Sequence, residues 1–238
     1  MCLTSNIQVC YSNEMLNITS PYPYKEFKRK SVNGKRLYEN PYGEPVPSVT
    51  TILDKTKPRE KREALQRWKK RVGEEQAQKI VTEAANVGTI MHNILEHWVK
   101  NEQYTGEAIL QAKMMADTVK QNIEQDLDEV WGSEVNLCYP QLYAGTTDLV
   151  GVYKGEPHIM DFKQTNKPKK REWIDDYFMQ AAAYGMAHNE VFDTKIERAA
   201  IFMCSRDLEW QLFEVGPEEF EMWTEKWAQR VAEFYNLS

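Results

Sequence analysis

The sequence has no pair of closely spaced cysteines. Its 238 residues include four scattered cysteines: Cys2, Cys10, Cys138 and Cys204. An iron–sulfur cluster needs several thiolates that can converge on one site, and this spacing does not offer them. We therefore expect no iron–sulfur cluster, and free, mostly buried thiols in a reducing compartment.

Long apolar runs and targeting segments are also lacking. No stretch approaches the ~20 apolar residues of a membrane-spanning helix, so no membrane association is expected. Residues 1–24 carry one charged side chain, Glu14, and have neither the basic start and apolar block of a secretory signal nor the arginines of a transit peptide. We expect a protein that acts inside the cell, in the cytoplasm or, if it is phage-encoded, in the cytoplasm of the host.

Positive charge is in deficit over the whole chain but is concentrated locally. Lysine and arginine number 30 against 36 acidic residues, a formal net charge of −6. Net charge governs solubility, whereas a local basic groove can still bind phosphates. Three segments are basic, at 25–30, 67–71 and 163–171, and each alone is typical of a solvated face. Their joint occurrence around the motif described next makes these residues candidate DNA contacts: Lys69, Lys70, Arg71, Lys167, Lys169, Lys170 and Arg171.

A predicted hairpin carries the residues most specific for a chemical function. Alternation with period 2 predicts one strand from Asp148 to about Val152 and a second over 158–163, joined by a turn. This hairpin would place Asp148 beside Asp161. Asp161 and Lys163 would share one face of the second strand.

Two carboxylates this close predict a metal site. Like charges repel unless a cation lies between them. Carboxylate oxygens suit Mg²⁺ or Mn²⁺, which Asp148 and Asp161 would hold, and the backbone carbonyl of Phe162 can complete the ligand shell because its side chain faces away. Lys163 cannot bind a cation while charged, and it is placed to orient the attacking water and stabilise the phosphorane. The pattern indicates a metal-dependent nuclease.

Four motifs in one order resemble the PD-(D/E)xK nuclease superfamily, specifically its RecB-like branch. The motifs are Gly88-x-x-x-His92, Asp148, Asp161-x-Lys163 and Gln180-x-x-x-Tyr184. A resemblance to one exonuclease family of that branch extends from about Tyr38 to the C-terminus, and Gln164 departs from the threonine that commonly follows the lysine. The resemblance implies an α/β (α+β) fold: a restriction-endonuclease-like core with a mixed central sheet flanked by helices, and an N-terminal helical and hairpin elaboration.

The resemblance also assigns residues that spacing alone does not. It implies that His92 is a further metal ligand, and that Gln180 and Tyr184 hydrogen-bond the substrate backbone or the attacking water. Without it, His92 is typical of a structural histidine, and Gln180 with Tyr184 of a polar helix face. Glu134 lies where relatives often have a glutamate; it is either a metal ligand through water or a member of a surface ion pair.

The pattern of elements predicts a single nuclease domain over residues 1–238. We divide it into a hairpin and loop region (1–47), a helical region (48–131) and a catalytic core (132–238). Asn33-Gly34 is expected to form the turn of a hairpin over 27–39. Helices are expected at 60–85, 88–100, 107–130, 172–189 and 217–236, and a closing hairpin over 198–215.

Two positions in the helical region allow more than one interpretation. Ser48 either caps a short helix or, together with Thr50, meets phosphate oxygens. Trp68 lies on an apolar stripe with Leu65 and Val72, and we expect it to pack in the core rather than to stack on bases.

The leading hypothesis from the resemblance is a single-strand-specific DNA exonuclease in replication, recombination or repair. The alternatives are a structure-dependent DNA endonuclease with the same site and a non-catalytic nucleic-acid-binding module. Helicase motifs are absent from the sequence, so a helicase or replication protein is the expected partner, and the chain is expected to be a monomer. The helices over 60–85 and 88–100 are expected to frame an opening that admits one strand.

Overall fold

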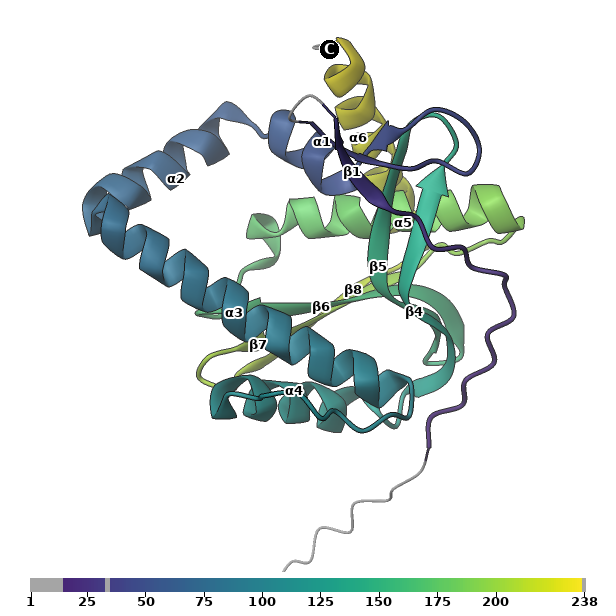
Figure 1. Cartoon of the computed structure of the whole chain (residues 1–238), viewed down its shortest axis with the longest axis horizontal. Helices are drawn as coiled ribbons and strands as arrows, with labels where there is room; N and C mark the ends of the chain where they lie inside the picture. Colours follow the sequence, from purple (N-terminus) through teal and green to yellow (C-terminus); the bar gives the residue numbers. More distant parts are fainter. Residues whose placement is uncertain (1–14, 33–34, 237–238) are drawn as a thin grey trace, which may run out of the picture.

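A mixed sheet flanked by helices forms the centre of the computed structural model, which describes residues 15–32 and 35–236 (Figure 1). Within these residues the main sheet has five strands in the order β4-β5-β6-β7-β8. Only the β6–β7 pair is parallel. The strands are β4 (Leu127–Tyr139), β5 (Tyr143–Tyr153), β6 (Glu156–Thr165), β7 (Ala199–Ser205) and β8 (Trp210–Val215). The predicted α/β class is confirmed.

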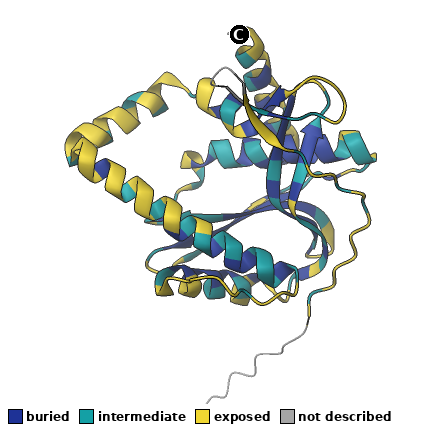
Figure 2. Ribbon diagram, viewed as in Figure 1, coloured by how far each residue is buried: buried dark blue, intermediate teal, exposed yellow. Residues whose placement is uncertain are grey.

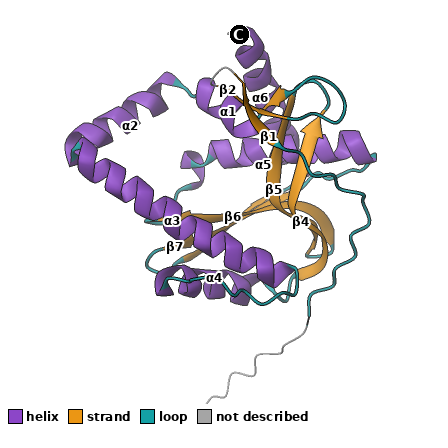
Figure 3. Cartoon of the chain, in the orientation of Figure 1, coloured by secondary structure: helices purple, strands orange, loops and turns teal. Residues whose placement is uncertain are grey.

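Two apolar cores lie on opposite faces of this sheet (Figure 3). One face packs against α1, α5 and α6, and the other against α3 and α4. The helices are α1 (Val49–Lys55), α2 (Arg59–Val72), α3 (Glu74–Val99), α4 (Leu110–Ile123), α5 (Asp175–Phe192) and α6 (Pro217–Asn236), with a short 3₁₀ helix η1 (Arg171–Trp173) before α5. The sheet is thus covered on both sides, as expected for a sheet that contains a parallel pair.

A small second sheet precedes the helices. Among the described residues it comprises β1 (Arg29–Val32), β2 (Lys35–Tyr38) and β3 (Val46–Pro47), all antiparallel. Val32 pairs with Lys35, as a two-residue hairpin turn requires. The predicted turn residues Asn33 and Gly34 lie outside the described residues.

The predicted boundaries of the first two long helices are wrong. The structure breaks the helix at Gly73 and continues it without interruption through residues 85–88. Gly73 has φ +87°, a conformation that glycine adopts at little cost and that ends a helix. At Gly88, inside α3, an added Cβ would be in ordinary contact with Gln164 at 3.7 Å, so the space around it does not require a glycine.

The predicted helix over 107–130 is also too long. α4 ends at Ile123, and β4 begins at Leu127, inside the segment predicted to be helical. Leu127 and Val130 are buried in the core shared with α3 and α4, and this burial overrides the helical periodicity of the segment. An N-terminal segment lies along this strand, where Ile18 forms a bridge with Val130.

Two cysteines can be described, and both are buried with free thiols. Burial raises the pKa of the Cys138 and Cys204 thiols to about 11. Cys2 and Cys10 lie outside the described residues. None of the helices in the described part of the chain is long and apolar enough to cross a bilayer.

Candidate active site

The site forms where β5 and β6 separate. Leu149 pairs with Met160, so one step further along the antiparallel register Asp148 faces Asp161. The backbone N–H of Phe162 donates to Asp148 Oδ2 at 2.7 Å. The Asp148 carboxylate therefore stands in for the next backbone hydrogen bond between β5 and β6. Asp148 and Asp161 are side by side, as predicted.

Three potential ligand residues, of which Asp148 is one, gather at this point. One ligand atom each from His92, Glu134 and Asp148 lies within 4.8 Å of the others. His92 Nδ1 is 3.5 Å from Asp148 Oδ2, and Glu134 faces Asp148 across the β4–β5 ladder between the pairs Ser133–Leu149 and Val135–Thr147. Glu134 has φ +52°, a left-handed conformation that is uncommon for a residue with a Cβ. Such local strain is concentrated at functional sites.

Asp161 takes a different position from the three. Its carboxylate is buried and forms an ion pair with the Lys163 ammonium, which lies on the same face of β6. The Lys163 Nζ is also 5.1 Å from the ring centroid of Tyr177, on the first turns of α5. Tyr177 is not among the residues predicted from the sequence, although it lies three positions before Gln180 on the same helix. Phe162 points the other way, into the core with Phe202.

The charges of these groups are strongly interdependent. Burial opposes the charge of Lys163, but the carboxylates of Asp161 and Asp148 outweigh it and raise the pKa of the lysine. Burial likewise opposes the charge of His92, and the neighbouring Asp148 carboxylate raises its pKa. The pKa of Asp148 is held below its ordinary value, against burial, by His92 and Lys163. Lys163, His92 and Asp148 therefore stabilise one another in their charged forms, whereas burial and the Asp148 carboxylate raise the pKa of Asp161 to about 6 in spite of the nearby Lys163.

The environment of Glu134 indicates that a cation would stabilise the cluster. Partial desolvation of its carboxyl and the nearby carboxylates of Asp148 and Glu96 raise the pKa of Glu134 to about 7, although the residue as a whole is exposed. Glu96 itself accepts from Lys100 at 2.5 Å. A divalent cation among these groups would remove the repulsion, and a nitrogen and carboxylate oxygens are suitable ligands for it. The donor set thus fits a divalent metal ion.

Gln180 and Tyr184 form one unit on α5. The amide Nε2 of Gln180 donates to the Tyr184 hydroxyl at 3.1 Å, and Tyr184 is buried. The Tyr184 ring lies on Gly145 of β5, where a Cβ would come within 2.7 Å of its Cε1 atom. Gly145 thus permits the close approach of helix and sheet, and Tyr184 orients the half-buried Gln180.

The residues predicted to contact DNA fall into two groups. Ser48 is buried and its hydroxyl accepts from the Thr51 N–H at 3.0 Å, so it caps α1, whereas Thr50 is exposed. The guanidinium of Arg171 donates to the Glu214 carbonyl and pairs with Glu219, which ties it to β8 and α6. The other predicted cations are exposed or partly exposed: Lys69, Lys70, Arg71, Lys167, Lys169 and Lys170.

The helix α2 that carries three of these cations stands away from the core. Every residue of α2 is described, and none is buried (Figure 2). The expectation that Trp68 packs in the core is wrong, because it is only partly buried, and Leu65 on the same stripe is 45% exposed. An amphipathic pattern predicts a helix, but burial of its apolar face depends on a neighbour that α2 lacks along most of its length.

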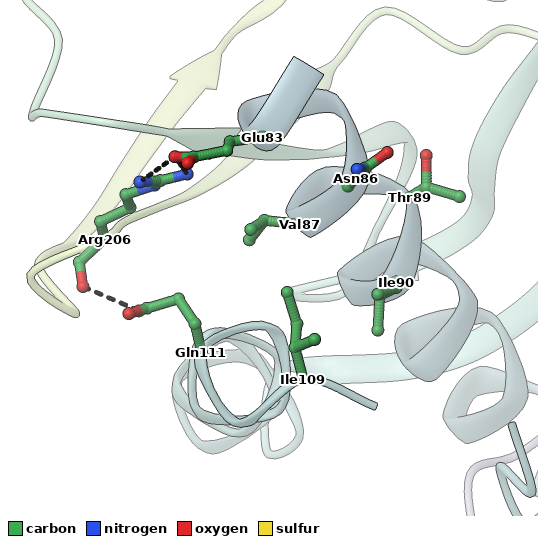
Figure 4. A pocket seen from close by; sticks show the side chains of 8 residues that line it. All are labelled: Glu83, Asn86, Val87, Thr89, Ile90, Ile109, Gln111 and Arg206. Atoms are coloured by element: carbon green, nitrogen blue, oxygen red, sulfur yellow. Dashed lines mark hydrogen bonds and ion pairs between the residues drawn. The ribbon is translucent and has the colours of Figure 1, made fainter. Parts of the chain in front are cut away.

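Two cavities flank the site. A cavity of about 320 Å³ is bordered by Glu134, by Lys100 and by the N-terminal segment at Tyr24. A larger one, of about 590 Å³, lies between α3 and α4 and is bordered by Arg206, whose guanidinium pairs with Glu83 at 3.3 Å (Figure 4). None of the residues that line the larger cavity belongs to the cluster of His92, Glu134 and Asp148.

Together the fold and the site define a class: a mixed α/β protein with a histidine–carboxylate cluster and a paired lysine at the divergence of two strands. No family model matches the chain. It is similar to curated proteins named mitochondrial genome maintenance exonuclease 1. The human protein is 26% identical over 175 residues, which covers 68% of this chain and 50% of the relative. The Xenopus tropicalis protein is 27% identical over 179 residues, which covers 68% of this chain and 49% of the relative.

The solved structures give a weaker likeness. A crystal structure from Eubacterium rectale, whose exonuclease assignment is provisional, is 14% identical with a TM-score of 0.44 and covers 64% of this chain and 67% of its own. The chain spans about half the length of the curated relatives it matches. The sequence similarity to the curated exonucleases supports the predicted nuclease-like relationship, and assignment to the RecB-like branch stays a prediction.

Proposed function

We propose that this protein is a metal-dependent deoxyribonuclease that hydrolyses single-stranded DNA from free ends in replication, recombination or repair. The observation that carries the proposal is the convergence of His92, Glu134 and Asp148 within 4.8 Å beside the Asp161–Lys163 ion pair. A cation site adjoining a buried ammonium suits a reaction in which negative charge develops on phosphate oxygens.

The residues divide the chemistry among themselves. His92, Asp148, Asp161 and the Phe162 carbonyl, with Glu134, would hold Mg²⁺ or Mn²⁺. When bound, such an ion lowers the pKa of a water molecule and polarises the phosphate. Lys163, kept charged by Asp161, stabilises the phosphorane and orients the nucleophile. Gln180, oriented by Tyr184, donates to the substrate backbone or to the water.

End dependence is supported by the helices before the sheet. α2 carries seven basic and two acidic residues, and Lys61 in its first turn lies 3.5 Å from Asp176 in the first turn of α5. The basic helix therefore starts beside the helix that bears Gln180. A strand that must pass between α2 and the core would have to enter by a terminus, and a stiff duplex would be excluded.

One experiment tests metal, strand and end together. Linear single-stranded, circular single-stranded and linear duplex DNA are incubated with Mg²⁺, and in parallel with excess chelator. We expect degradation of linear single strands alone, and only with the metal. Full activity in chelator would refute the metal mechanism. Equal cleavage of the circular form would favour the structure-dependent endonuclease, and binding without any cleavage the non-catalytic module.

A further inference from the structure

The side chain of Trp173 is the most exposed aromatic ring in the described part of the chain, at 57%. Single exposed apolar residues are common on protein surfaces, so exposure alone is not informative. Trp173 differs from a random surface residue in three respects: its place in the chain, the rigidity of its segment and the charges around it.

Trp173 lies in the segment that leaves the active site on β6 and returns to it on α5. β6 carries Asp161 and Lys163, and the segment over 166–174 follows it directly. Four positions after Trp173, the Tyr177 ring lies 5.1 Å from Lys163 Nζ. Trp173 is therefore four positions in the chain before a residue that contacts the active-site lysine.

The segment is held rigidly by contacts to the core. Gln211 on β8 makes two hydrogen bonds with the Lys169 backbone, accepting from its N–H at 2.7 Å and donating to its carbonyl at 2.8 Å. The Arg171 guanidinium is tied to the Glu214 carbonyl at 2.8 Å, and the Trp173 N–H donates to the Lys170 carbonyl at 3.0 Å. The ring is thus presented on a fixed backbone, and a ligand that contacts it loses little entropy in ordering the protein.

One cation, Lys170, lies against the ring. Lys170 Nζ is 5.4 Å from the Trp173 ring centroid. The same Nζ is 4.0 Å from Oε1 of Glu172, whose side chain is exposed. The Lys61–Asp176 contact brings the start of the basic helix α2 to the start of α5, next to this segment. An aromatic face among exposed cations matches the pattern by which proteins bind single-stranded nucleic acid.

We propose that Trp173 is a base-stacking platform for an unpaired nucleobase of single-stranded DNA, with Lys170 placed against the adjoining phosphate. The inference rests on the proposed function and names the chemical feature that this surface recognises. In a duplex both faces of each base are covered by its stacked neighbours, whereas a single strand leaves them available. Stacking on Trp173 therefore favours single strands independently of any threading.

Binding in excess chelator separates this role from catalysis. The anisotropy of a labelled oligo(dT) strand is compared with that of an abasic strand of the same length and charge. Trp173→Ala is expected to weaken binding of oligo(dT) by about 5- to 150-fold, the range for one stacked base, and to leave the abasic strand unaffected. Trp173→Phe should retain most of the affinity for oligo(dT). Lys170→Ala should weaken both strands and flatten their salt dependence.

Tyr235→Ala is the matched control, because Tyr235 is another exposed aromatic residue, at 41%, near the far end of α6. It should change neither affinity. Thermal melts check that each variant folds, and Trp173→Leu replaces the alanine variant if that one does not. An unchanged affinity of the Trp173 variant for oligo(dT), or an equal loss for both strands, would overturn the inference.

The outcomes also separate this inference from the proposed function. Selective loss of oligo(dT) binding in a protein that cleaves no DNA would support the platform and refute the nuclease. Cleavage of linear single strands by the wild type, with oligo(dT) binding unaffected in the Trp173 variant, would support the nuclease and refute the platform.

Discussion

α2 and α5 differ in how their sequences relate to burial. α2 has the sharper apolar stripe, yet none of its 14 residues is buried. α5 has a weak stripe, and nine of its 18 residues are buried. A helix that is apolar on all sides is enclosed by its neighbours. An amphipathic helix has one apolar face that can pack against a neighbour, but the pattern does not ensure that a neighbour is there. The difference means that α5 fixes the geometry of the site and α2 supplies charge outside it.

α5 reaches this position through two close approaches. Tyr184 lies on Gly145 of β5, and on the opposite side Gly185 lies against Phe220 of α6, where a Cβ would come within 2.5 Å of the Phe220 ring. Small residues therefore allow α5 to fit between the sheet and α6. Changes at the α5 side should alter stability or chemistry, and changes on α2 should alter only binding.

The largest effect is expected at the cluster that the sheet and α5 support. Asp148→Asn removes a charge on which both His92 and Lys163 depend. We expect cleavage to fall by about 10³-fold or more at saturating DNA, with the protein still folded. Asp54→Asn, at an exposed aspartate of α1, is the control and should cleave normally. Normal cleavage by the Asp148 variant would mean that the site is wrongly assigned.

Lys163→Ala is expected to have the next largest effect. It should lower kcat by about 10²–10³-fold, the usual result of losing one group that stabilises the transition state, and should change KM little. Single-turnover cleavage at saturating DNA measures this. Lys195→Ala, a lysine whose side chain is 82% exposed, should leave kcat unchanged. A purely KM effect in the Lys163 variant would place the lysine in binding and weaken the division between the two regions.

Gly145→Ala tests the close approach of α5 to the sheet. The new methyl group would meet the Tyr184 ring, and we expect a loss of about 1–3 kcal/mol in the free energy of unfolding. Denaturant titration followed by far-ultraviolet circular dichroism measures the loss. Gly155→Ala adds a Cβ that meets nothing within 4 Å but strains a φ of +78°, and it separates backbone strain from crowding. Full stability of Gly145→Ala would contradict the packing argument.

On α2 the expectation concerns binding alone. Replacing Lys69, Lys70 and Arg71 together by alanine should raise KM and flatten the salt dependence of binding by about 0.7 in slope for each phosphate that is no longer neutralised. kcat should be unchanged, because α2 contributes no residue to the cluster. Steady-state kinetics over a range of salt concentrations decides this. A fall in kcat as large as that of Lys163→Ala would show that α2 acts in the chemical step.

The smallest effect is expected for Leu65→Ala on the apolar stripe of α2. Because Leu65 is 45% exposed, its truncation should change the free energy of unfolding by less than about 0.5 kcal/mol. Ile201→Ala, at a fully buried position of β7, should cost about 2–5 kcal/mol in the same titration. A large loss at Leu65 would mean that the stripe is covered in solution.

Much of the catalytic half could be predicted from the sequence. Alternation along 148–163 predicted the hairpin and the shared face of Asp161 and Lys163, because side-chain direction in a strand follows residue parity. The closing hairpin was predicted within one or two residues for the same reason, and the C-terminal helix was predicted from the helical spacing of its apolar residues.

What could not be predicted depends on tertiary neighbours. The break at Gly73 and the continuous helix through Gly88 involve the same residue type, and the difference is in the backbone, with φ +87° at Gly73 alone of the two. Tyr177 gives no local signal of its contact with Lys163, because that contact crosses from α5 to β6. The place of Glu134 beside Asp148 depends on the β4–β5 register and on its left-handed backbone.

The parallel pairing of β6 with β7 has a consequence for the timing of assembly. Asp161 pairs with Ile201 and Lys163 with Met203, and the whole of α5 lies between the two strands in the chain. Parallel strand pairs form slowly, because the chain loses the entropy of closing a long crossover before any stabilising contact between the strands forms. A chain still on the ribosome therefore carries every ligand of the metal cluster well before the strand that fixes Asp161 and Lys163 is made. The proposed nuclease should therefore stay inactive until β7 has docked.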